Sequence, residues 1–141
     1  MSVLETIIGR RKPNFDAYDL ILDLVQKFMI ESKSQSPIPI REYTPPQQAV
    51  LTMYTYGALV YLSELHEVAK AEQIFVLDAY LQRQGLSNKQ SVVEAKIIVE
   101  QAKDPNMQWG AEIGYNSAMY WHKDGDVNAS KALARLLKTT R

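Results

Sequence analysis

Apolar positions recur along most of the chain at the three- and four-residue spacing of an α-helix. The clearest stripe joins Phe15, Tyr18, Leu22, Val25 and Met29 on one helical face. No segment alternates between apolar and polar residues for long enough to predict a strand. The pattern predicts an all-α fold, a compact bundle or short array of six to seven antiparallel helices. Residues 1–141 are expected to form a single helical domain.

Local signals predict where several helices begin and end. Segments 44–47 and 87–90 each place a hydroxyl residue three positions before a glutamine, which is the pattern of a capping box. Asp104, followed by a proline, is typical of a helix start, and Asn14 could cap the first long helix. Gly85 and Gly125 are expected to end helices, because glycine adopts left-handed backbone angles without a Cβ clash.

Two interruptions are expected in the first half of the chain. Residues 32–46 contain four prolines, which remove amide donors and predict an extended connecting loop, or alternatively a docking segment. From there the helical pattern continues to Gln84, which is too long for one ordinary helix. We therefore predict a break between Ser63 and Glu67. A further short helix is expected near residues 3–8.

Composition narrows the functional classes. The 141 residues carry 16 basic and 16 acidic side chains, and this balance disfavours nucleic-acid binding, which needs clustered positive charge. The one tight basic cluster, residues 10–12, is interpreted as a solvated helix end. No cysteine is present, so thiolate metal sites and disulfides are excluded. No apolar run suits a signal peptide or a membrane span, and we expect a cytoplasmic protein without membrane contact.

The usual signatures of metal and cofactor sites are not found. His66 and His122 lack the partners that helical zinc or di-iron sites require. The acidic segment 124–128 fails as a calcium loop, because neither register supplies the turn glycine and the bidentate acid. We expect no cofactor and no metal. Gly110 and Gly114 form a small-residue step that predicts a close approach between two helices.

Aromatic residues are the best candidates for a binding surface. Tyr54 and Tyr61 share the main apolar stripe of their helix and are expected in the core. Tyrosine and tryptophan combine a large contact area with a polar tip and are enriched at binding hot spots. Five other aromatic or ring-bearing residues are predicted to contact a partner: Tyr56, Trp109, Tyr120, Trp121 and His122. Of these, Trp121 and His122 lie near a turn and are expected at the surface.

The C-terminal third, residues 92–141, resembles a tetratricopeptide-type unit, especially its Sel1-like variant. The resemblance is carried by Ala111-Glu112, Tyr115-Asn116, Ala118, Tyr120, Gly125-Asp126 and Lys131-Ala132-Leu133. Two features depart from the family pattern: Ser117-Ala118 replaces the usual Leu-Gly pair, and Asp126 replaces the second turn glycine. The resemblance implies helix hairpins whose stacked faces leave a concave surface for a protein or peptide.

These features together favour a non-catalytic helical module that binds another protein, as an adaptor, an inhibitor or an immunity-type neutralising partner. Two alternatives remain open. The first is a small helical enzyme that uses Glu112, Tyr115, His122 and Asp124 as acid–base groups in a groove between helices. The second is an obligate homodimer whose extra aromatic face is its own interface.

Overall fold

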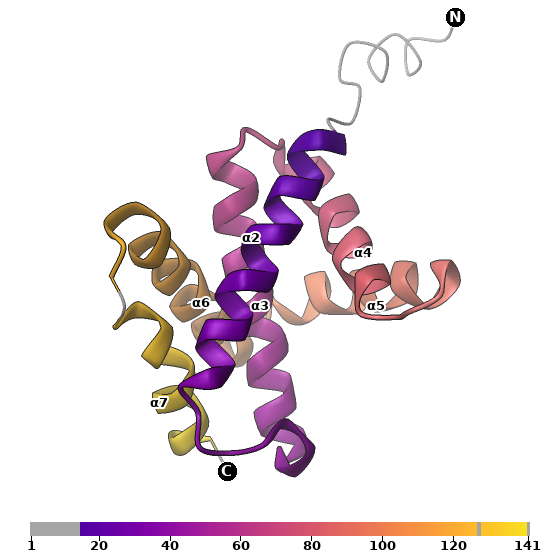
Figure 1. The fold of residues 1–141 in the computed structure, drawn as a ribbon. Helices are drawn as coiled ribbons and strands as arrows, with labels where there is room; N and C mark the ends of the chain where they lie inside the picture. Colours follow the sequence, from indigo (N-terminus) through magenta and orange to yellow (C-terminus); the bar gives the residue numbers. More distant parts are fainter. Residues whose placement is uncertain (1–14, 127, 141) are drawn as a thin grey trace, which may run out of the picture.

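The computed structural model describes residues 15–126 and 128–140 (Figure 1). The predicted short helix at 3–8, the cap at Asn14 and the basic cluster at 10–12 lie outside these ranges. The α-helices are α2 (Phe15–Ser34), α3 (Pro45–Leu65), α4 (Gln73–Arg83), α5 (Asn88–Gln101), α6 (Pro105–Asp124) and α7 (Ala132–Thr139). Three short 3₁₀ turns lie between them: η1 (Ile40–Glu42), η2 (Lys70–Glu72) and η3 (Ala129–Lys131). The described part of the chain contains no strand, so the predicted all-α bundle is confirmed.

The helix ends follow the local signals closely. Both capping boxes are formed, since the side chains of Thr44 and Ser87 accept from the third helical amide and the glutamines bond back to the caps. Asp104 caps α6 by accepting from an amide of its first turn. Gly85 and Gly125 have φ of 102° and 61°, the left-handed region predicted for them. These boundaries are therefore confirmed.

The predicted break in the long helical pattern is also confirmed, whereas the bounds of the proline-rich loop are wrong. The helix α3 ends at Leu65, and Glu67 has a left-handed φ of 60°. The prediction placed residues 32–46 in a connecting loop, but α2 continues to Ser34 and α3 already begins at Pro45. The hydroxyl of Ser32 is buried and shares a hydrogen bond of 3.1 Å with Tyr54. This tertiary contact explains why α2 includes Ser32, a position that the sequence pattern assigned to the loop.

Helix α3 is the centre of the bundle and packs against α2, α4, α5, α6 and α7. Figure 1 shows α2 running antiparallel to α3, and α7 antiparallel to α6. The largest interface, however, joins α3 and α6, which run in the same direction: Val50 lies near Gly110, and Tyr54 near Gly114. The expected antiparallel arrangement therefore does not extend to this central pair. Two parallel helices cannot follow each other directly, because the chain must first return to the end of the bundle where the first helix began. Here α4 and α5 make this return between α3 and α6.

Glycines permit the close contact of α3 and α6. A Cβ added to Gly114 would lie 2.0 Å from the carbonyl oxygen of Tyr54, and one added to Gly57 would lie 1.9 Å from that of Ala111. These distances are far inside van der Waals contact, so the two backbones touch where a side chain would otherwise stand. The predicted close approach at Gly110 and Gly114 is confirmed, with α3 as the partner helix.

Candidate functional site

A groove of about 690 Å³ lies between α3 and α6 and is bordered by the last turn of α5 and by η2. Its apolar lining is formed by Tyr56, Val60 and Val99. Charged side chains from α3, η2, the turn between α5 and α6, and α6 also line it: Glu64, Lys70, Lys103 and Glu112. The groove is open to solvent, and its mixture of apolar and charged groups is typical of a surface that binds a polypeptide.

The close approach of the two helices determines the position of the groove. Gly57 and Ala111, the small residues at the contact, both line it. Larger residues follow on either side, Tyr56 on α3 and Tyr115 on α6. Small residues where the backbones meet and large residues beside them leave a channel along the junction of α3 and α6.

One hydrogen bond links the two helices at the groove. The hydroxyl of Tyr115 donates to Oε2 of Glu64 at 2.5 Å, and the ring of Tyr115 contacts Tyr61 edge-on with centroids 5.4 Å apart. The pKa of the Tyr115 hydroxyl is raised, mainly by this hydrogen bond and to a smaller extent by burial. Burial also raises the pKa of Tyr56, against the opposing effect of the nearby Lys103 charge. Both phenols are therefore neutral hydrogen-bonding groups at physiological pH.

The four groups of the enzymatic alternative do not meet in one place. Glu112 and Tyr115 line the groove, whereas His122 and Asp124 belong to the last turn of α6 and are absent from its lining. The raised pKa of Tyr115 favours its protonated form, which can donate a hydrogen bond but makes a poor base. Among the described residues, no group of three or more His, Asp or Glu side chains is placed to hold a metal ion. The geometry of the groove is that of a surface with hydrogen-bonding and charged groups along an apolar channel.

Three of the predicted partner-binding residues lie in or beside the groove. Tyr56 is half-buried within it. Trp109 and Tyr120 are 40% and 50% exposed, and they share one face of α6 because eleven residues correspond to about three helical turns. The half-buried Ile113 lies between them on this face. Asn116 lines the groove and lies four residues before Tyr120 and seven after Trp109, so this face adjoins the groove. We call Trp109, Ile113 and Tyr120 the α6 stripe.

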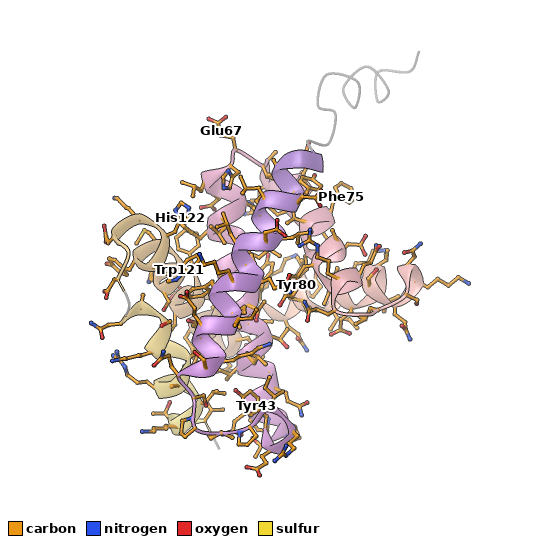
Figure 2. All side chains as sticks on the ribbon, in the orientation of Figure 1. Tyr43, Glu67, Phe75, Tyr80, Trp121 and His122 are labelled. Carbon is orange, nitrogen blue, oxygen red and sulfur yellow. The ribbon has the colours of Figure 1, made fainter. Side chains whose placement is uncertain are left out.

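The expectation of an exposed Trp121 is wrong. The side chain is half-buried between α6 and α2, with its ring centroid 5.2 Å from that of Phe28 (Figure 2). Its Nε1 donates to Oε2 of Glu31 at 2.5 Å, so its polar edge is also used within the molecule. Its proximity to the turn after α6 suggested exposure, but α2 covers that side of the helix. His122 is exposed, as expected, and its ring lies 6.3 Å from that of Trp121.

Sequence reasoning missed the charged residues of the groove. Glu64 lies on α3, Lys70 on η2 and Lys103 in the turn between α5 and α6, and no local pattern in the sequence links these three charges. Only the packing of α3, α5 and α6 brings them together. Val60, four residues after Tyr56 on α3, also lines the groove.

The described helices include none that is both long enough and apolar enough to cross a bilayer.

In the segment that resembles a Sel1-like unit, α6 and α7 form a hairpin in which Ala118 and Leu133 are fully buried. Such packing is common to helix hairpins in general, and the family resemblance stays a prediction. Comparison with protein-family models, with curated proteins and with solved structures gave no match to this chain.

Proposed function

We propose that this chain is a non-catalytic helical module that binds another protein in the groove between α3 and α6, with the α6 stripe as its rim. The observation that carries the proposal is the adjacency of the two features. A channel with apolar residues and charged groups lies beside an exposed tryptophan and an exposed tyrosine. Binding hot spots are enriched in these two residue types, and surrounding polar groups orient the partner.

The form of the groove also supports a polypeptide ligand. It is open to solvent and lies between two parallel helices. Lys70 comes from η2 and Lys103 from the turn after α5, whereas Glu64 and Glu112 come from α3 and α6. A partner segment that carries both acidic and basic residues fits this distribution by electrostatic complementarity. Adaptor, inhibitor and immunity-type roles all use binding of this kind. The balanced charge of the chain favours a protein over a nucleic acid as the partner.

The test is affinity capture with the full chain from its native host, followed by mass spectrometry. The variant combines Trp109→Ala with Tyr120→Ala, two exposed positions whose truncation leaves the core intact. The matched control is Ile30→Ala, an apolar side chain that is 62% exposed on α2. We expect the wild type and the control to recover one protein in stoichiometric amount. The double variant should bind it at least about tenfold more weakly.

Two results would contradict the proposal. The first is equal recovery by the wild type and the double variant, which would place binding elsewhere. The second is turnover of a substrate that depends on Glu112 or Tyr115, which would assign the groove to an enzyme.

A further inference from the structure

Helix α5 exposes an apolar face to solvent. Val93 is 58% exposed, and Val92 and Ile97 are each 43% exposed. The opposite face is buried, and there the hydroxyl of Ser91 donates to Asp78 of α4. The helix is thus fixed to the bundle on one side and bears unpartnered β-branched residues on the other. Clustered exposed apolar residues on a helix are typical of an association surface.

The position of α5 makes this face accessible along its length. The helix packs mainly against α4, with a small contact to α3. Figure 1 shows the first part of α5, with the turn that joins it to α4, projecting from the body of the bundle. A second helix can therefore lie along α5 without meeting the rest of the bundle.

The order of charges along this face indicates what can lie against it. Lys89, Val93, Ile97 and Glu100 follow one another at intervals of four, four and three residues, so they form one seam. The basic residue stands near the start of α5 and the acidic residue near its end. An antiparallel copy of the same helix would place each Lys89 opposite a Glu100 and each Val93 opposite an Ile97. A parallel copy would instead bring like charges together.

The other charges near the seam agree with this arrangement. Glu100 is already paired through Oε1 with Lys103 Nζ at 3.0 Å, but its side chain is 72% exposed and its second oxygen can accept from a further cation. Lys96 lies four residues before Glu100, within reach of it along the helix. The helix dipoles of an antiparallel pair also oppose each other favourably.

A hollow beside the seam provides space for the end of a partner helix. It measures about 680 Å³ and is lined by Gly85 and Leu86 of the turn and by Lys89, Gln90 and Val93 of α5. In the antiparallel arrangement, the last turn of the second α5 lies over this hollow. Two-fold symmetry then fills both hollows at once, as expected of an isologous interface.

We infer that two copies of this chain form a homodimer by antiparallel pairing of their α5 helices through the Lys89–Glu100 seam. The inference goes beyond the proposed function, because the apolar part of the seam, Val93 and Ile97, does not line the binding groove. The two surfaces meet only where Glu100 of the seam pairs with Lys103 of the groove.

The test is sedimentation equilibrium of the full chain from micromolar to near-millimolar concentration, with circular dichroism to verify the fold of each variant. The wild type is expected to be dimeric. Val93→Glu combined with Ile97→Glu should give a monomer. Lys89→Glu alone, or Glu100→Lys alone, should weaken the dimer about tenfold, because each single reversal creates two repulsive contacts. Both reversals in one chain should restore the dimer, which a merely structural effect would not do.

Phe75→Ala is the matched control, since Phe75 is 59% exposed on α4 and lies outside the seam. It should dimerise as the wild type does. A wild type that stays monomeric throughout the concentration range would overturn the inference. A dimer that survives the two glutamate substitutions, or that fails only when Trp109 and Tyr120 are truncated, would do so too, and would move self-association to the α6 stripe.

Discussion

Substitution of Gly114 by alanine tests the packing of the two central helices most directly. The added Cβ would lie 2.0 Å from the carbonyl oxygen of Tyr54 and 2.8 Å from its Cα. Both are backbone atoms of a helix and cannot move aside by a change of rotamer. An ordinary contact between such atoms needs more than about 3.2 Å, so α6 must move away from α3 by about 1 Å.

Two opposing effects determine the size of the loss. Alanine stabilises a helix by about 1 kcal/mol relative to glycine. An unfolded chain with alanine has less backbone entropy than one with glycine, so less entropy is lost on folding. Overpacking of a well-filled interior costs about 1–3 kcal/mol, and more when backbone has to shift. The interface between α3 and α6 is the largest in the bundle, so separation of these helices loosens contacts along most of their length. A cost at the upper end of this range, less the gain in helix propensity, gives an expected net destabilisation of about 2 kcal/mol.

Urea unfolding followed by far-ultraviolet circular dichroism measures this loss, together with a melting temperature lowered by about 3 °C per kcal/mol. Gly110→Ala is the matched control on the same helix. Its Cβ would lie 3.2 Å from Cβ of Met53, a tight contact but not a collision with backbone. The gain in helix propensity should nearly offset this contact, so the control should stay within about 1 kcal/mol of the wild type.

The Gly57→Ala variant gives a second measurement at the same interface. A Cβ at Gly57 would lie 1.9 Å from the carbonyl oxygen of Ala111, so the single variant should be as costly as that at Gly114. The double variant should cost less than the sum, because the shift that relieves one collision partly relieves the other. If Gly114→Ala were as stable as the wild type, or more stable, the close approach of α3 and α6 would be refuted.

Two further predictions concern the core. Gln47 and Gln90 occupy the same position in their capping boxes, but Nε2 of Gln47 also donates to the carbonyl oxygens of Leu137 and Thr140 at 3.1 Å each. Gln47→Ala should therefore lower the free energy of unfolding by about 2–3 kcal/mol, against about 1 kcal/mol for Gln90→Ala. Equal losses in urea titrations would show that the hydrogen bonds from Gln47 to Leu137 and Thr140 contribute nothing. Burial raises the pKa of Tyr54 to about 12, so the folded state retains this proton where the unfolded state, with a pKa near 10, loses it. Stability should fall as pH rises from about 10 to about 12, by about 3 kcal/mol from this group, and less steeply in Tyr54→Phe; parallel pH profiles of the two proteins would contradict the assignment.

The sequence alone determined the helical class and the helix ends that carry a capping residue or a glycine. The capping boxes at 44–47 and 87–90, the cap at Asp104 and the left-handed glycines depend on contacts within four or five residues. Such contacts form in the same way whatever surrounds them, which is why a pattern in the chain is enough to find them. Where a boundary depended on a distant partner, as at the end of α2 with its buried Ser32, the local pattern gave the wrong residue.

Only the tertiary structure decided which helices meet and therefore where the candidate groove lies. The spacing of Gly110 and Gly114 predicted a close approach without naming α3 as the partner, and nothing near Trp121 in sequence indicated that α2 would cover it. The pairing of α3 with α6 is a sum of many weak contacts between residues about sixty positions apart, none strong enough alone to leave a local signature. The charges that line the groove come from several elements, so their meeting is a property of the packed bundle and of no single segment.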